Sequence, residues 1–130
     1  MRPKCSILVL LLALAFLLAA CGSNAGTATP TADGPQISLM TSPDPAQTGN
    51  VDLVVTVKDA QGQPITDAQV FIFTNHQDMS GMGNEYAGTM QEDGRYTATT
   101  DLDMGGRWRI TVQVNQPSQR TVKDFDLEVK

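Results

Sequence analysis

The segment Arg107–Val114, RWRITVQV, decides the fold class of this chain. Its apolar side chains alternate one by one with polar ones, which is the pattern of a β-strand with one buried face. The apolar set is Trp108, Ile110, Val112 and Val114. Trp108 lies within this regular strand, so we assign it to the core and not to a binding site. The segment predicts a strand that contributes one face to a hydrophobic core.

Six further segments have the composition of strands. Val51–Lys58 alternates apolar and polar residues, and Ala68–Thr74 is apolar on both sides in its middle, as expected for a central strand covered on both faces. No segment has helical periodicity. The chain is therefore predicted to be all-β, a seven-stranded, immunoglobulin-like antiparallel sandwich. The predicted strands are Gln36–Met40, Val51–Lys58, Ala68–Thr74, Tyr86–Met90, Tyr96–Leu102, Trp108–Val114 and Val122–Val129.

The first twenty residues have the features of an export signal. Arg2 and Lys4 precede an apolar run, Ser6–Ala20, of fifteen residues, which is short for a bilayer span of about 20 residues. The run ends in LAACG, residues 18–22, which resembles the bacterial lipobox with its acylated cysteine. We expect a lipoprotein signal peptide over residues 1–20 and lipidation at Cys21. The alternatives are a plain secretory signal or an uncleaved anchor.

Processing at Cys21 divides the remaining chain into a tether and a domain. Residues 21–35 consist mostly of small and turn-forming residues, so we expect a flexible tether. Residues 36–130 form the folded domain, which has no cysteine and therefore no disulfide. The lipid places the protein at the cell membrane, on its extracytoplasmic face, with the membrane as its first partner.

Charge narrows the choice of other partners. Removal of residues 1–20 leaves seven basic and fourteen acidic residues, a formal net charge of −7. A surface of this sign argues against nucleic acid as a partner and is compatible with cations.

The loop between the third and fourth predicted strands concentrates soft donor atoms. It contains His76, the single histidine of the chain, together with Met79 and Met82. If connections alternate between the two ends of the sandwich, Met40 and Met104 lie at the same end as this loop. Thioether sulfur and imidazole are ligands that suit Cu(I), so these five residues are candidate ligands of a Cu(I) ion.

Two other interpretations of the loop are open. Methionines at the end of a sandwich also serve simply to close the core, and a lone histidine in a loop is usually solvated. Asp101 and Asp103 raise the question of calcium, but the oxygen ligands and the late glutamate of a calcium loop do not follow them. Copper is therefore a possible cofactor, and none is certain.

Several short motifs follow one another in a fixed order along the chain. They are Gly62-x-Pro64, Asp67-Ala68-x-Val70, Met79-x-x-Met82, Gly94-x-Tyr96, Met104-Gly105-Gly106-x-Trp108-x-Ile110 and Val112-x-Val114. This order resembles the YtkA-like domain, a relative of FixH-type domains of exported bacterial proteins. The most specific part is the methionine-rich loop followed by Met-Gly-Gly-x-Trp. The resemblance spans roughly residues 51–114 and implies a β-sandwich without an established enzymatic activity.

The sequence lacks the constellations that catalysis needs. One histidine is present, no G-x-S-x-G elbow occurs, and no phosphate loop or dinucleotide fingerprint is found. We therefore predict no enzymatic activity. The sequence favours a lipid-anchored, extracytoplasmic binding module, with Cu(I) bound through the His/Met loop. The alternative function is a structural or protein-interaction domain of an envelope complex that binds no metal.

Overall fold

The structure is a computed structural model that describes residues 34–130. The signal peptide predicted over residues 1–20, and the lipidation site Cys21 with most of its tether, lie outside the described residues. Between residues 34 and 130 there is no helix long and apolar enough to cross a membrane.

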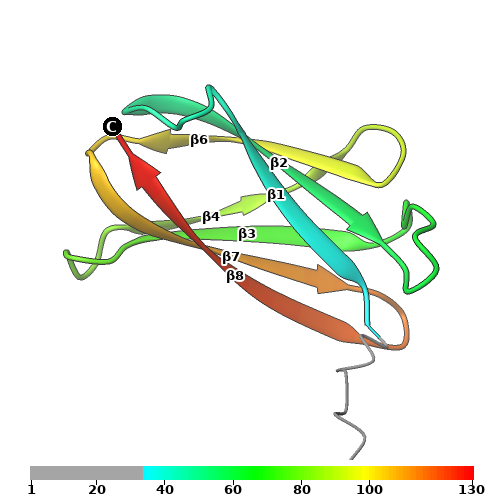
Figure 1. Ribbon diagram of the computed structural model, residues 1–130. Helices are drawn as coiled ribbons and strands as arrows, with labels where there is room; N and C mark the ends of the chain where they lie inside the picture. The colour runs from blue at the N-terminus through cyan, green and yellow to red at the C-terminus, as the bar shows by residue number, and fades with distance from the viewer. Residues whose placement is uncertain (1–33) are drawn as a thin grey trace, which may run out of the picture. The chain divides into compact units, whose positions relative to one another are not determined.

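Residues 34–130 form eight antiparallel strands arranged in two four-stranded sheets. Figure 1 shows how the strands are arranged in space. The all-β prediction is confirmed, but the predicted count of seven strands is wrong. One sheet has the order β1-β2-β6-β5 and the other has the order β4-β3-β7-β8. The strands are β1 (Gln36–Ser42), β2 (Gly49–Lys58), β3 (Gln69–His76), β4 (Gly83–Ala87), β5 (Thr89–Met90), β6 (Arg95–Leu102), β7 (Gly106–Asn115) and β8 (Arg120–Val129).

The eighth strand arises because the chain changes sheets at Gly88. β4 pairs with β3, whereas β5 pairs with β6 in the other sheet. The Gly88 N–H donates to the carbonyl oxygen of Val70 at 2.8 Å, and a Cβ atom at Gly88 would lie 3.2 Å from the Cβ atoms of both Val70 and Tyr96. Glycine lets the chain pass closely between the two sheets at this point. The segment predicted as one strand, residues 86–90, is therefore two.

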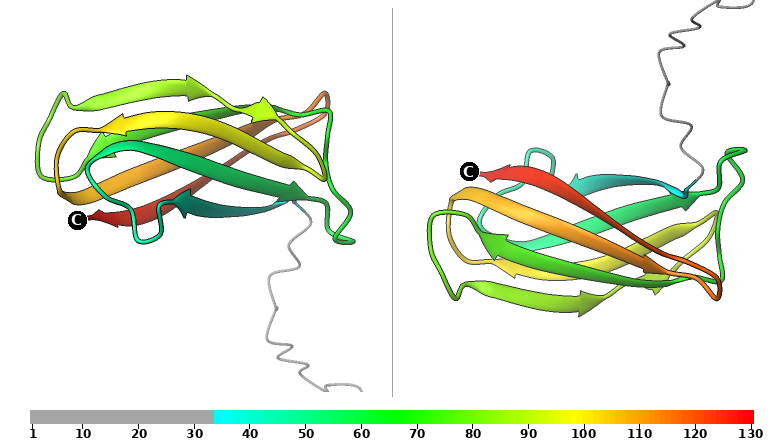
Figure 2. Two further views of the ribbon diagram at one scale, coloured as in Figure 1. Left: turned by 90° about the horizontal axis from the view of Figure 1, so that it is seen from above. Right: turned by 90° about the horizontal axis from the view of Figure 1, so that it is seen from below.

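The core lies between the two sheets. Figure 2 shows the two sheets from above and from below. The alternation in β2 and β7 places one face of each strand inside, as predicted. Trp108 is 2% exposed and Tyr96 is 1% exposed. No buried side-chain nitrogen or oxygen atom within residues 34–130 lacks a hydrogen-bond partner. The inward apolar residues of β2 and β7 are Val51, Leu53, Val55, Val57, Trp108, Ile110, Val112 and Val114.

Strand pairing defines two ends of the sandwich. His76 pairs with Trp108 and Gly49 pairs with Leu102, so the end of β3, the end of β6 and the start of β7 lie together. We call this end the methionine pole; its loops are residues 43–48, 77–82 and 103–105. The opposite end, where β1 begins at Gln36, is the N-terminal pole, with the loops 59–68, 91–94 and 116–119.

β3 is a central strand, as predicted, but only one of its faces is buried by other strands. Val70 and Ile72 point into the core, whereas Phe71 and Phe73 lie on the outer face of their sheet and are half-buried. The expectation of cover on both faces was wrong because β3 belongs to a two-layer sandwich, in which each sheet has one outer face.

Lys123 joins the two sheets at one side of the sandwich. It is on β8, opposite Val112 of β7, and its Nζ donates to the carbonyl oxygen of Ile37 on β1 at 2.8 Å. The same ammonium group lies 5.1 Å from the centre of the Phe125 ring. This contact ties β1 to β8, strands that are 86 residues apart at the contacting pair.

Candidate metal site at the methionine pole

His76 is a buried residue of a strand and not part of an exposed loop. β3 continues two residues beyond the predicted end at Thr74, so its inward series runs through Thr74 to His76. The imidazole is 8% exposed. Its Nδ1 atom lies 3.3 Å from the backbone nitrogen of Asp78, and its Nε2 atom lies 3.2 Å from the carbonyl oxygen of Gly105.

These two partners assign one tautomer to the ring. The Asp78 N–H can only donate, so Nδ1 accepts with its lone pair. The Gly105 carbonyl can only accept, so Nε2 carries the proton and donates it. Both nitrogens of the His76 ring are thus engaged, and the ring connects the β3–β4 loop to the β6–β7 loop.

Trp108 supports the same connection from β7. Its ring is edge-on to the imidazole of His76, with centroids 5.1 Å apart and an interplanar angle of 80°. The indole Nε1 donates to the carbonyl oxygen of Met104 at 3.0 Å. The main chain adds to the connection, because the backbone N–H of Gln77 donates to the carbonyl oxygen of Arg107 at 2.8 Å. The two loops are therefore held side by side by buried rings and by the main chain.

Three of the predicted ligands lie on these two loops. Met79 and Met82 belong to the β3–β4 loop, and Met104 belongs to the β6–β7 loop. Met79 is 44% exposed and Met104 is 37% exposed, while Met82 is half-buried. The backbone carbonyl of Met82 accepts from the His76 N–H at 3.0 Å. The structure thus brings together the chain segments that carry these methionines.

Met40 lies elsewhere on the surface. It pairs with Val54 in the β1–β2 ladder, and its side chain is on the outer face of that sheet, where it is 66% exposed. The structure does not bring it to the other four candidates. Met90, which is 44% exposed, pairs with Tyr96 toward the N-terminal pole.

Carboxylates surround the methionine pole. Asp78 forms an ion pair of 2.6 Å with Arg107, in which both side chains are more than half exposed. Glu85 on β4, Asp101 near the end of β6 and Asp103 in the β6–β7 loop are also exposed. Within residues 34–130, no three His, Cys, Asp or Glu side chains gather closely enough to hold a metal ion by themselves.

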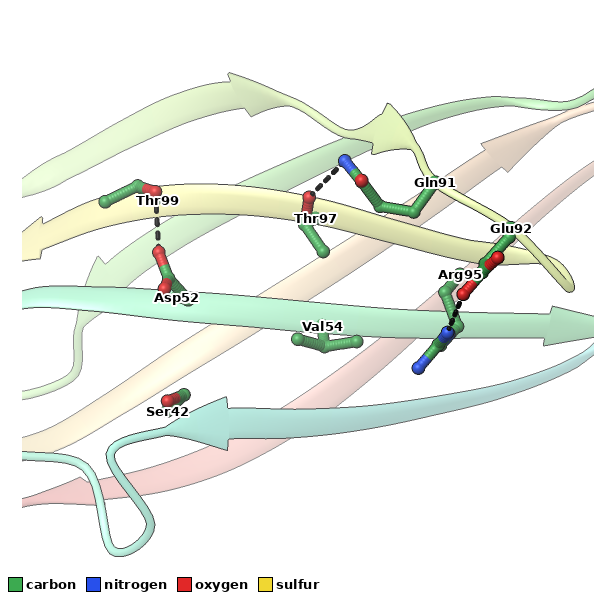
Figure 3. A pocket seen from close by; sticks show the side chains of 8 residues that line it. All are labelled: Ser42, Asp52, Val54, Gln91, Glu92, Arg95, Thr97 and Thr99. Carbon is green, nitrogen blue, oxygen red and sulfur yellow. Dashed lines mark hydrogen bonds and ion pairs between the residues drawn. The ribbon is translucent and has the colours of Figure 1, made fainter.

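A separate groove of about 600 Å³ lies on the outer face of the β1-β2-β6-β5 sheet (Figure 3). Hydrogen bonds organise its polar groups: Thr99 donates to Asp52 at 2.6 Å, and Gln91 donates to Thr97 at 3.1 Å. An exposed ion pair of 2.9 Å, Arg95–Glu92, lies at one end. Sequence reasoning missed this groove, although the polar residues alternate along β2 and β6.

The groove offers hydrogen-bond donors and acceptors from several side chains. Its lining contains no histidine, cysteine or lysine, and its basic groups are the carboxylates of Asp52 and Glu92. Its carboxylates are occupied by a threonine and an arginine. Its eight lining residues are Ser42, Asp52, Val54, Gln91, Glu92, Arg95, Thr97 and Thr99.

Fold and site together define an all-β domain of two packed antiparallel sheets, with a methionine-bearing pole. The YtkA-like family model matches residues 30–113, which is more than half of the chain, and the chain therefore belongs to the YtkA-like family. The expected kinship with FixH-type domains stays a prediction. Comparison with curated proteins gives no match.

Solved structures share the fold at low sequence identity. The soluble domain of PmoD from Methylocystis sp. ATCC 49242 (Rockwell) has a TM-score of 0.50 and 12% identity; the match covers 75% of this chain and 92% of that one. An engineered protein solved by crystallography has a TM-score of 0.54 and 11% identity, covering 75% of this chain. The match spans only 20% of that engineered protein. Both similarities concern the fold alone.

Proposed function

We propose that this protein is a lipid-anchored, extracytoplasmic, non-catalytic module that binds Cu(I) at its methionine pole. The observation that carries the proposal is the junction of the β3–β4 loop with the β6–β7 loop. The first loop bears Met79 and Met82, and the second bears Met104. Thioether sulfur is a soft, neutral donor that selects Cu(I) over hard cations.

Exposure and charge support this function. Met79 and Met104 are substantially exposed, so their sulfur atoms are accessible to an ion from solvent. A neutral sulfur set leaves the charge of the ion uncompensated. The exposed carboxylates of Asp101, Asp103 and Glu85 lie around the same pole and offset that charge at longer range.

Anchoring and fold complete the proposal. β1 begins at Gln36, at the N-terminal pole. A lipid on Cys21 would therefore join the domain at that pole, and the methionine pole lies at the opposite end of the domain. The strand order of the two sheets supports an immunoglobulin-like sandwich, because it matches the ABED and CFG sheets of that fold with one added edge strand, β4. The groove in Figure 3 supports a non-catalytic role, because its two carboxylates are engaged by Thr99 and Arg95 and its lining holds no histidine, cysteine or lysine.

A Cu(I) titration tests the proposal. The full chain is prepared in detergent with Cys5→Ser and Cys21→Ser, because free thiols bind Cu(I) tightly. Affinity is measured anaerobically by competition with a chromogenic Cu(I) chelator. We expect one Cu(I) per chain, and we expect Met79→Leu with Met82→Leu to weaken binding at least tenfold, about 1.4 kcal/mol. Leucine preserves the apolar volume and removes the sulfur.

Met90→Leu is the matched control, because Met90 and Met79 are both 44% exposed and lie on different parts of the surface. This variant is expected to bind Cu(I) as tightly as the parent. An unchanged affinity in the Met79/Met82 double variant refutes the copper function.

The second candidate function is a structural or protein-interaction domain of an envelope complex. The outer face of the β4-β3-β7-β8 sheet favours it. Phe71 and Phe73 are half-buried there. Gln113 of β7 pairs with Phe71 on one side and with Val122 of β8 on the other, and Val122 is 52% exposed. Aromatic residues on an open sheet face are common at protein interfaces. If the titration refutes Cu(I) binding, the structural or protein-interaction role is the better explanation of this surface.

A further inference from the structure

The hydrogen bonds of the His76 ring determine which donors can reach an ion at the methionine pole. We infer that the site is formed by thioethers alone, those of Met79, Met82 and Met104; this inference rests on the proposed Cu(I) function. His76 is a positioning residue that holds the two loops together, and its ring is not a ligand.

A metal ion needs a lone pair, and the ring has none to spare. Coordination at Nδ1 would replace the hydrogen bond from the Asp78 N–H and leave that donor without its partner. Coordination at Nε2 would require loss of its proton, and the ion would then meet the Gly105 carbonyl oxygen now 3.2 Å away. Either route undoes one of the two bonds that join the loops.

Space around the ring is restricted as well. A Cβ atom placed on Gly106 would lie only 3.1 Å from Nε2 of His76. On another side the ring is covered by the edge contact with Trp108. With 8% of the residue exposed, His76 is almost fully enclosed, so an ion at either ring nitrogen would displace a neighbouring group.

The methionine side chains are in the opposite situation. Met79 and Met104 reach into solvent, and each has three rotatable bonds with which to adjust to an ion. The main chain of Met82 is fixed by its bond from His76, and that of Met104 by its bond from Trp108. The buried rings therefore hold the backbones that carry the sulfurs while leaving the sulfurs free to bind.

This donor set determines which cations the site accepts. Three neutral sulfur atoms suit monovalent soft ions, Cu(I) and Ag(I). Zn²⁺ and Ni²⁺ bind well where imidazole is available, and the inferred site offers none. The site is therefore expected to discriminate against divalent metals.

Three measurements on the Cys5→Ser, Cys21→Ser chain test the inference. X-ray absorption of the Cu(I)-loaded protein is expected to show only sulfur in the first shell. Because His76 is the single histidine of the sequence, selective ¹⁵N-histidine labelling gives one imidazole spectrum. That spectrum is expected to keep the Nε2–H tautomer during titration with Cu(I) and to stay unchanged with Zn²⁺. Met104→Leu is expected to weaken Cu(I) binding at least tenfold, and Met40→Leu to leave it unchanged.

The outcomes separate this inference from the proposed function. Absence of Cu(I) binding by the parent chain overturns both. Cu(I) binding with nitrogen in the first shell, or with a change in the tautomer of His76, overturns the thioether-only site and keeps the copper function. Full affinity in the Met104→Leu variant likewise overturns the inference, because the second loop then contributes no ligand.

Discussion

At the N-terminal pole, the hydroxyl of Tyr96 donates to the Ile65 carbonyl oxygen at 3.0 Å and accepts from the Ala68 N–H at 3.2 Å. At the methionine pole, the ring of His76 accepts from one loop and donates to the other, and Trp108 packs against it. Each pole is thus closed by a buried aromatic side chain that bonds to loop backbone.

The poles differ in what they present to solvent. The loops of the N-terminal pole contain no methionine, whereas those of the methionine pole contain three. Closing a sandwich therefore does not require methionine here, because the N-terminal pole is closed without it. This contrast favours a chemical role for Met79, Met82 and Met104 over a packing role.

Trp108→Ala is expected to destabilise the methionine pole more than any other substitution considered for either pole. It removes a buried ring that contacts His76 and bonds to the backbone of Met104. Large-to-small core substitutions of this kind cost about 3–5 kcal/mol. The free energy of unfolding by urea measures the loss, and hydrogen exchange at Asp78 and Gly106 is expected to rise more than exchange at Ala68.

Trp108→Phe is the control for this variant. It keeps most of the ring but removes the N–H that bonds to Met104, so the expected cost is about 0.5–1.5 kcal/mol. If Trp108→Ala lowers the free energy of unfolding by less than about 3 kcal/mol, the role of Trp108 at the methionine pole is contradicted.

Tyr96→Phe tests the other pole and is expected to have an intermediate effect. It leaves the Ile65 carbonyl without its donor and the Ala68 N–H without its acceptor, which costs about 1–3 kcal/mol in a buried setting. Burial raises the pKa of the Tyr96 phenol above its usual value of 10.0; the hydrogen bond from Ala68 opposes this rise and the Asp67 carboxylate adds to it.

The sign of the pH dependence follows from that pKa. The folded state favours the protonated phenol, so its stabilising contribution is complete below the unfolded pKa of about 10. It is lost as the pH rises through the higher folded pKa. Urea unfolding between pH 9 and 11, a range set around that reference value, is expected to show a decline in the parent that exceeds the decline in Tyr96→Phe. Equal declines would exclude Tyr96 as the group responsible.

Asp78→Asn is expected to have the smallest effect. It removes an ion pair with Arg107 in which the two side chains are 52% and 62% exposed, and exposed pairs contribute about 0–1 kcal/mol. The backbone N–H that binds His76 is retained. Unfolding at low and high salt measures the difference, which is expected to shrink further in high salt. A loss comparable to that of Trp108→Ala would mean that the ion pair holds the pole.

Local alternation was sufficient to predict most strands. Along β2 and β7 the apolar series is uninterrupted, so period 2 determines both the strand and its buried face. The division of residues 86–90 was not predictable in this way. It depends on contacts of Gly88 with Val70 and Tyr96, which come from two other strands.

The candidate site was less predictable than the fold, although part of the missing information was present in the sequence. Continuing the series Val70, Ile72 and Thr74 by one step reaches His76 and predicts that its ring points inward. Likewise Ile37 is inward on β1, so Met40, three positions later, is outward. Composition drew attention to His76 and Met40, but the alternation of inward and outward positions along each strand determines where their side chains lie.

Lys123 has a consequence for the open edge of the β4-β3-β7-β8 sheet. β8 is ten residues long and has no neighbour on one side within its own sheet, and such strands readily recruit another chain. A lysine on such an edge strand disfavours pairing with a second copy, and the Lys123 ammonium also bonds to β1 of its own chain. If Cys21 carries lipid, the molecules are concentrated in two dimensions, and this one ammonium group helps to keep them separate.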